Sequence, residues 1–483
     1  MNQTRIERDS MGEMSVPADS LYGASTERAV LNFPISHEPV DPEIIHAYGL
    51  IKWAAARANG ELGHLPKNKR DLIEQAAREV FEGLHDRHFP VDVYQTGSGT
   101  STNMNVNEVI ANRCAQLAGV PVDAPRDAKP VHPNDDVNKG QSSNDTFPTA
   151  MHIAVGVALK NDLLPAVRSL YDSLAAKATE FHDVLKIGRT HLMDATPVRL
   201  GQEFSGYAAQ AANAVPRTER ALDAVRELAL GGTAVGTGLN CHPAFPGKAI
   251  AFIANESGID FREAPNHFEA QAAKDGLVEC HGQLNTIAAA LFKIANDIRL
   301  LGSGPRCAIG EISLPPTQPG SSIMPGKVNP VMSEAVTMAA ARVFGNQTTV
   351  TWCGANGHFE LNVFMPVMAK CLLESIRLLA NVCTVFRERC IKDITANREH
   401  CKSLIEHSLS MVTSLAPIIG YDLASKIAKE SVETGRTVRE ICTELLPDLH
   451  ITTDQLAEAL DPANMAGGQI PREREKVSEP EMT

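Results

Sequence analysis

The sequence predicts a mostly α-helical chain built around a central bundle of long helices. Two observations support this fold class. At 277–301 apolar residues recur at steps of three and four, and a similar pattern returns at 360–386. The predicted apolar seams consist of Leu284, Ile287, Ala288, Leu291, Ile294, Ala295, Ile298 and Leu301 in the first helix, and of Phe364, Met368, Cys371, Leu378, Val382 and Phe386 in the second.

The remaining elements follow in chain order. Residues 1–140 mix short helical patterns with loops marked by Pro and Gly, and 148–181 and 197–230 are mostly helical. Pro165 and Pro216 predict kinks or breaks in the last two segments, because proline cannot donate to the helical ladder.

The pattern divides the chain into three predicted domains. These are an N-terminal mixed helical domain at 1–141, a central long-helix bundle at 142–395, and a small helical domain with a polar tail at 396–483. Helices this long and apolar favour packing against copies of themselves, so a homo-oligomer is expected.

Composition excludes several classes of protein. The 483 residues carry a net charge of −13, which argues against a nucleic-acid binder. The sequence contains no run of about 18 apolar residues, so we expect no membrane span. The polar N-terminus has no apolar leader, and the ten cysteines include no C-x-x-C pair, so we expect reduced thiols in a cytoplasmic protein.

Four polar stretches interrupt the helical patterns: "TGSGTSTNMN" (96–105), "HPNDDVNKGQSSND" (132–145), "GRTHLMDATP" (188–197) and "GSSIMPGKVNP" (320–330). Each precedes a helical pattern and is rich in capping residues. Hydroxyl groups, free backbone N–H groups and the positive ends of helix dipoles suit a small anion. Caps and turns alone would not need such polar density in four places.

The side chains in these stretches favour proton transfer beside a bound anion. His191 is a candidate acid or base, Ser321 and Ser322 lie in a glycine-flanked loop, Lys327 could neutralise a carboxylate, and Glu334 could orient the histidine. No metal or cofactor is expected, because no cluster or dinucleotide motif accompanies these groups.

A nucleotide-binding alternative fails on spacing, and a metal-binding alternative fails on the number of ligands. Five residues separate Gly320 from Gly326 where a P-loop needs four, and Val328 replaces its Ser or Thr. The pair His85 and His88 has helical spacing but no obvious third ligand.

The stretch "GSSIMPGKVNP" resembles the signature of the fumarase/aspartase superfamily, and the other three polar stretches match that family as well. Within the superfamily, the chain is most similar to the class II fumarate hydratases. The nearest rival is aspartate ammonia-lyase, and three features favour the fumarases: His191 after "GRT", "SSN" at 142–144, and Gly326 before the loop lysine. A catalytically silent lens homologue is a further alternative, disfavoured because the candidate groups are intact.

The resemblance implies a role for each candidate position. Ser321 would remove the C3 proton of malate, and His191, oriented by Glu334, would act on the hydroxyl or water. One position departs from the family, since Lys129 stands where an arginine is usual. The implied substrate-binding residues are Ser98, Gly99, Thr100, Ser142, Ser143, Asn144, Thr190, Ser322, Lys327, Val328 and Asn329, and an implied second dicarboxylate site comprises Lys129, His132, Pro133, Asn134 and Asp135.

The resemblance also implies the assembly and the reaction. Four chains would form a twenty-helix core, with each active site drawing on three of them. The expected reaction is the reversible hydration of fumarate to (S)-malate, a step of the tricarboxylic acid cycle, through an aci-carboxylate and without a cofactor. The loop at 320–330 would then be mobile and close over the substrate dianion.

Overall fold

The structure is a computed structural model that describes residues 3–467. The chain separates into two compact units, each made of three segments. Unit 1 consists of Met1–Pro165, Pro216–Ala288 and Ala339–Ala380, and unit 2 consists of Ala166–Val215, Ala289–Met338 and Asn381–Thr483. The three-domain division at 141 and 395 stays a prediction.

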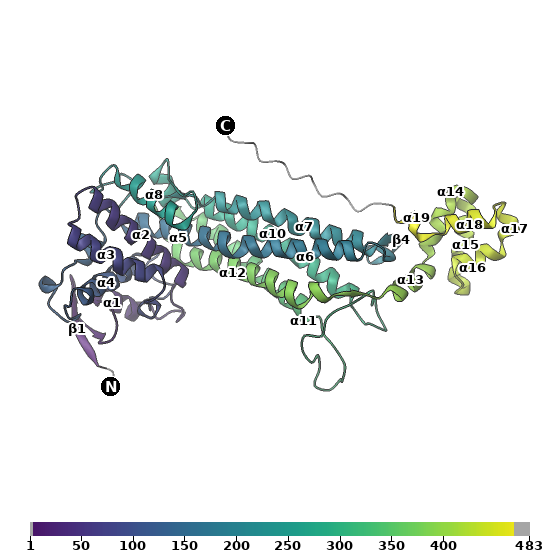
Figure 1. Cartoon of the computed structure of the whole chain (residues 1–483), viewed down its shortest axis with the longest axis horizontal. Helices are drawn as coiled ribbons and strands as arrows, with labels where there is room; N and C mark the ends of the chain where they lie inside the picture. Colours follow the sequence, from purple (N-terminus) through teal and green to yellow (C-terminus); the bar gives the residue numbers. More distant parts are fainter. Residues whose placement is uncertain (1–2, 468–483) are drawn as a thin grey trace. The chain divides into compact units, whose positions relative to one another are not determined.

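The elements of unit 1 are mostly helices with a few short strands (Figure 1). They are β1 (Thr4–Asp9), β2 (Gly12–Pro17), α1 (Ala24–Asn32), α2 (Pro42–Glu61), α3 (Lys67–Phe81), α4 (Thr100–Leu117), the π-helical turn η3 (Pro133–Val137), α5 (Ser143–Ala158), β5 (Glu227–Leu228), α8 (Phe245–Ser257), β6 (Arg262–Glu263), α9 (His267–Ala272), β8 (Gly357–His358) and β9 (Leu361–Asn362).

Unit 2 holds one well-formed β-hairpin and a group of short helices towards the C-terminus. These elements are β3 (Leu185–Thr190), β4 (Met193–Arg199), β7 (Ile312–Ser313), β10 (Thr395–Ala396), α13 (Arg398–Glu406), α14 (Ala416–Ile419), α15 (Tyr421–Thr434), α16 (Val438–Glu444), α17 (Leu446–Leu449), α18 (Thr453–Ala459) and α19 (Pro462–Met465).

Five further helices contain the boundaries between segments of the two units. They are α6 (Leu164–Glu180), α7 (Leu200–Asp223), α10 (Asp275–Leu301), α11 (Val331–Gly354) and α12 (Met365–Arg389). The helices predicted at 277–301 and 360–386 therefore exist, as α10 and α12. None of the helices in residues 3–467 is long and apolar enough to cross a membrane.

The first predicted apolar seam lies wholly in the core. Its eight residues, from Leu284 to Leu301, are at most 5% exposed within a single chain. In the second seam Met368, Cys371 and Phe386 are buried, whereas the rest are half-buried. The α10 run is thus covered without a partner, contrary to the expectation that its apolar length alone requires copies of the chain.

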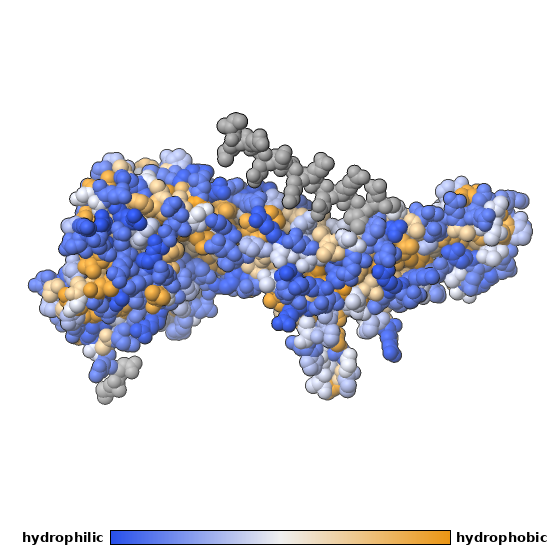
Figure 2. Space-filling view, in the orientation of Figure 1, coloured by the Kyte–Doolittle hydropathy of each residue, from blue (hydrophilic) through white to orange (hydrophobic). Residues whose placement is uncertain are grey.

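Other apolar residues on the long helices do reach the surface. Phe292 and Leu300 of α10, Met338 and Trp352 of α11, and Val385 of α12 are between 36% and 68% exposed. Figure 2 shows orange side chains among the polar ones along these helices. They lie outside the predicted seams, and they are the part of the bundle that a second copy could cover.

Two sequence expectations about local structure need correction. Pro216 lies inside α7, which continues past it, so it does not break the helix, and a kink there stays a prediction. Pro165 is the second residue of α6, directly after the π-helical turn η4 (Leu159–Leu163) that lies between α5 and α6, so the regular α-helical pattern is interrupted just before this proline. The stretch at 188–197 is not a junction onto a helix but the turn and strands of the β3–β4 hairpin.

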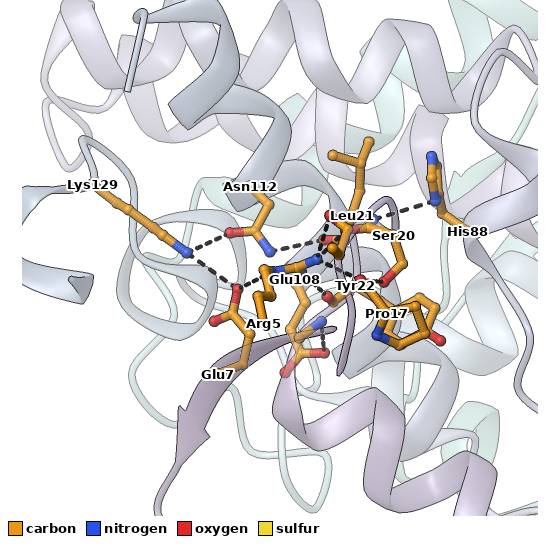
Figure 3. A network of polar contacts seen from close by, with 12 residues as sticks. Arg5, Glu7, Pro17, Ser20, Leu21, Tyr22, His88, Glu108, Asn112 and Lys129 are labelled. Atoms are coloured by element: carbon orange, nitrogen blue, oxygen red, sulfur yellow. Dashed lines mark hydrogen bonds and ion pairs between the residues drawn. The ribbon is translucent and has the colours of Figure 1, made fainter. Parts of the chain in front are cut away.

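A buried carboxylate closes the N-terminal part of unit 1. Glu108 of α4, labelled in Figure 3, is 7% exposed. It accepts hydrogen bonds from the N–H groups of Gly23, Ser25 and Thr26 at 2.9–3.1 Å and from the Thr26 hydroxyl at 2.6 Å. It thereby caps α1, whose first N–H groups have no partner inside the helix. Charge-assisted bonds of this kind are the stronger class of hydrogen bond.

The same region is tied together by Arg5 of β1 (Figure 3). Its guanidinium donates to the carbonyl oxygens of Pro17, Ala18, Ser20 and Tyr22 at 2.6–3.3 Å. A rigid fork of donors suits several carbonyl groups at once. The hairpin therefore fixes the segment that leads into α1.

We predict that Glu108→Ala lowers the free energy of unfolding by about 3 kcal/mol, because four donors lose a charged acceptor in a buried place. Glu108→Gln keeps one oxygen acceptor and should lose roughly half as much. Urea unfolding followed by circular dichroism compares the two with the unmodified chain. Equal stability of all three would show that Glu108 does not hold α1.

Candidate active site

In unit 1 the N-terminal ends of α4 and α5 are joined by hydroxyl groups. Thr100 begins α4 and Ser143 begins α5, and their side-chain oxygens share a hydrogen bond of 2.7 Å. The Ser98 hydroxyl adds a further hydrogen bond of 2.9 Å to the Thr100 hydroxyl. Two helix N-termini that meet in this way present free N–H groups and positive dipole ends to one place, which suits an anion.

Gly99 allows this meeting of helices. Its φ of 73° lies in the left-handed region, and a Cβ atom there would lie 1.9 Å from Cδ2 of Phe147 in α5. Any side chain at 99 would therefore collide with α5 and strain the backbone as well.

Ser142 and Asp145 close the start of α5 with a capping box. The Ser142 hydroxyl accepts from Asn144 N at 3.2 Å, and Asp145 accepts from Ser142 N at 2.9 Å. The other Asp145 oxygen accepts from the N–H groups of Gly231 and Thr233 at 2.9 and 3.0 Å. Asn144 donates to the Ala234 carbonyl at 2.8 Å, so the 231–234 segment and the start of α5 are fixed to each other.

Two buried residues beneath this turn were not among the predicted site residues. Burial raises the pKa of Asp145, and burial lowers the pKa of Lys52 in α2 to about 7. The sequence did hold one signal for Lys52, a single charge inside the apolar run "GLIKWAAA".

The "HPND" stretch forms η3, also in unit 1. The Nδ1 atom of His132 accepts from the N–H groups of Asn134 and Asp135 at 3.2 and 3.0 Å, and burial lowers the pKa of this histidine. Lys129 is turned towards Glu7 and Asn112, with Nζ distances of 3.4 and 2.8 Å (Figure 3). Its ammonium group is largely buried, and burial lowers its pKa. Lys129, the cation predicted for the second dicarboxylate site, is therefore already bonded to other side chains of the protein.

In unit 2, His191 occupies the tip of the β3–β4 hairpin. Thr190 pairs with Met193, so His191 and Leu192 form a two-residue turn, and both have left-handed φ values of 59° and 63°. This turn type normally takes Asn and Gly, and a leucine there is strained. The turn holds the His191 side chain out in solvent.

A buried ionic cluster lies at the base of that hairpin. Glu311 is fully buried, and one of its oxygens contacts Lys186 at 3.1 Å and Arg189 at 2.9 Å. Lys186 also contacts Glu203 of α7 at 3.1 Å, and burial raises the pKa of Glu203. Breaking one of these pairs would leave an unpaired buried charge, so the cluster helps to hold β3, the strand that ends at Thr190 just before His191.

The loop at 320–330 is closed upon itself by two bonds across its base. Gly320 N donates to the Lys327 carbonyl at 3.0 Å, and the Asn329 side chain donates to the Gly320 carbonyl at 2.7 Å. Between these ends Ser322, Lys327 and Val328 are exposed.

Ser321 has an environment that the sequence could not reveal. Its hydroxyl oxygen accepts hydrogen bonds from the N–H groups of Ile323 and Met324 at 3.2 and 3.1 Å. Donors aimed at this oxygen favour negative charge on it, and they leave its own proton free for another acceptor.

The predicted residues fall into groups rather than one set. Ser98, Thr100 and Ser143 are linked in unit 1, and Ser321 and Asn329 belong to one closed loop in unit 2. Glu334 lies half-buried in the first turn of α11, and within residues 3–467 no hydrogen bond joins it to His191 of the same chain. Among these residues no group of three or more potential metal ligands occurs either.

The candidate metal pair His85 and His88 is already engaged. His85 lies 2.7 Å from Glu79, and His88 accepts from Leu21 N at 3.2 Å (Figure 3). Burial lowers the pKa of His88 to about 4, so it stays neutral and acts as an acceptor in the fold.

Comparison with known proteins identifies the family. The profile described as "Lyase" matches residues 12–345, and that described as "Fumarase C C-terminus" matches 411–467. The chain therefore belongs to this family of lyases. It is 52% identical to a class II fumarate hydratase of Mycobacterium tuberculosis over 96% of each chain, and 52% identical to the mitochondrial fumarate hydratase of Rattus norvegicus over 96% of this chain and 91% of the rat protein.

A solved structure gives the same result for the fold. The class II fumarase of Schistosoma mansoni matches with a TM-score of 0.91 and 39% identity, over 96% of this chain and 99% of the other. The predicted fold class and the predicted resemblance to class II fumarate hydratases are both confirmed.

We predict that Gly99→Ala is much more costly than Gly119→Ala, which is a matched control. Both glycines have φ 73°, but nothing lies within 4 Å of a Cβ at 119. Both changes incur left-handed strain of about 1–2 kcal/mol, and Gly99→Ala adds overpacking of about 1–3 kcal/mol. Urea unfolding midpoints measure the difference. If the two variants were equally stable, Phe147 would not constrain position 99.

Proposed function

We propose that the chain catalyses the reversible hydration of fumarate to (S)-malate, the reaction that fumarate hydratases carry out in the tricarboxylic acid cycle. The main support for this conclusion is that the chain is 52% identical in sequence to fumarate hydratases over almost the whole length of both chains. The rival, aspartate ammonia-lyase, is not favoured by these relatives.

The proposed substrate-binding surface uses the polar stretches predicted from the sequence. Helix N-termini and hydroxyl groups would bind one carboxylate, and the loop groups the other. The proposed residues are Ser98, Gly99, Thr100, Ser142, Ser143 and Asn144 of unit 1, and Thr190, Ser322, Lys327, Val328 and Asn329 of unit 2.

Ser321 is the proposed base that removes the C3 proton of malate. That proton is a weak acid, and its removal adds a second charge to an ionised carboxylate. Preorganised donors must therefore stabilise both the serine oxygen and the aci-carboxylate. The two N–H groups on the Ser321 oxygen support the first requirement. Lys327 and Asn329 are the proposed donors for the second.

His191 is the proposed acid and base for the hydroxyl or water, with Glu334 as the group that orients it. The strained turn that exposes His191 supports this role, because strain of this kind concentrates at functional sites. Since no bond joins the two residues within one chain, we propose that the Glu334 that orients a given His191 belongs to another copy.

A homotetramer with active sites shared between chains is therefore proposed. The apolar residues left exposed on α10, α11 and α12 support an interface between copies. We further propose a cytoplasmic location, although one named relative is mitochondrial.

The second dicarboxylate site at Lys129, His132, Pro133, Asn134 and Asp135 remains a proposal. The exposed side of η3 supports it, because Asn134 and Asp135 face solvent. The contacts of Lys129 with Glu7 and Asn112 would have to weaken for a carboxylate to bind this cation.

Absorbance in the ultraviolet band of fumarate tests the proposed reaction. Fumarate should form from (S)-malate, and none should form from aspartate at the same enzyme concentration. Formation of fumarate from aspartate alone would make the chain an ammonia-lyase.

We predict that Ser321→Ala and Ser322→Ala fail in different ways. Loss of the base should depress kcat by about 10²–10⁴-fold with little change in KM. Ser322→Ala should mainly raise KM, by the cost of one bond to a charged group, roughly 1.5–3 kcal/mol. Steady-state kinetics with protonated and C3-deuterated malate separate the two. Equal turnover by both variants would exclude Ser321 as the base.

We predict that the His191→Asn and Ser321→Ala variants are each nearly inactive when assayed alone. When the two are mixed, dissociated and reassembled together, part of the malate turnover should return. Some hybrid sites regain both groups if the two residues reach a site from different chains. Size-exclusion chromatography with tagged chains confirms that hybrids form. Hybrids that stay silent would mean that each chain supplies both residues to its own site.

A further inference from the structure

Lys52 is a fully buried lysine close to the turn that begins α5. It lies in α2, and its Nζ atom donates to three amide oxygens: Asn103 Oδ1 at 2.9 Å, Asn138 Oδ1 at 2.9 Å and Gln141 Oε1 at 3.0 Å. The three acceptors come from α4 and from the segment just before Ser142. One ammonium group therefore ties together the two helix starts of unit 1.

The contacts of Lys52 differ from those of an ordinary buried lysine. Within residues 3–467 no acidic side chain forms an ion pair with it; the charge that acts on it is that of Asp145, further away. Asp145 is itself held by the N–H groups of Ser142, Gly231 and Thr233. Burying a cation without a paired carboxylate is costly, so the three amide bonds matter to the local structure.

The amides carry the effect of Lys52 onward to residues 142–144. Asn138 donates to the Gln141 carbonyl at 3.1 Å, and Gln141 donates to the carbonyls of Val137 and Lys139 at 3.1 and 3.2 Å. Both side chains thus have their oxygens on Lys52 and their N–H groups on backbone carbonyls within residues 137–141, directly before the turn at 142–144. The residue after Gln141 is the N-cap Ser142.

We propose that Lys52 is a positioning residue for substrate binding: its three-fold donation to Asn103, Asn138 and Gln141 fixes the turn at 142–144 in the geometry that binds a dicarboxylate dianion. This inference rests on the proposed function of that turn. Only a protonated amine can donate to three acceptors at once, so the charged form is the one that holds the turn. Lys52 itself touches no substrate.

The test is a split between KM and kcat in Lys52→Met, a neutral side chain of similar length. KM for malate and the Kd of the unreactive dicarboxylate succinate should both rise about tenfold, while kcat stays within about threefold. If Lys52 only supported the fold, its substitution would lower the unfolding midpoint and the active fraction but would leave KM and the succinate Kd unchanged.

Lys274→Met is the matched control. Lys274 is also buried in unit 1, and it donates to three backbone carbonyls, those of Ala270, Gln271 and Ala273, at 2.8–2.9 Å. This variant should be destabilised as well, with KM and the succinate Kd changed less than about twofold.

If Lys52→Met does not fold, Gln141→Leu decides, because it removes one of the three acceptors and leaves the lysine in place. It should raise both constants by about threefold. Unchanged KM and Kd in a folded variant, or a fall in kcat alone, overturns the role of Lys52. Wild-type protein that neither hydrates fumarate nor binds succinate would instead overturn the proposed function itself.

Discussion

The hydrogen bond between the hydroxyls of Thr100 and Ser143 is the contact on which the rest of the unit 1 site depends. It brings two helix starts together, and neither could approach the other if Gly99 carried a side chain. Three groups around this contact have fixed partners: Ser98, which bonds to Thr100, Asp145, which closes the capping box with Ser142, and Lys52, which bonds to Asn103. The positive ends of two helices are thus held in place, so the anion binding proposed for this site would require little reorganisation of the protein.

Unit 2 achieves a comparable preorganisation by different means. Its residues lie on a hairpin tip and a closed loop rather than on helix starts. The base of the hairpin is held by the ion pairs of Glu311 with Lys186 and Arg189. The base of the loop is held by hydrogen bonds between Gly320, Lys327 and Asn329. Such fixed bases would help to hold His191 and Ser321 in position in the active site proposed here.

The helical class and the long helices could be predicted because the spacing of apolar residues is a local property that is visible in the sequence alone. The sequence also located the polar stretches that make up the proposed site. It missed the hairpin at 188–197, because the sequence marks turns with Asn and Gly, and this turn instead contains His191 and Leu192 in strained conformations. It missed Lys52 and Asp145 because their importance lies in partners that are far away in the chain, such as Asn138 and Gly231. The exposed apolar residues on the long helices escaped for a similar reason, since burial along a helix depends on its neighbours.

The two N–H groups that point at the Ser321 oxygen also give the loop a built-in spectroscopic reporter. The amide hydrogens of Ile323 and Met324 share one acceptor, so their chemical shifts would move together when that oxygen loses its proton or turns away. Their exchange with deuterated solvent would accelerate only when the loop opens. The motion of the loop and the charge on its serine could therefore be followed separately, in the absence of turnover, from the same pair of backbone signals.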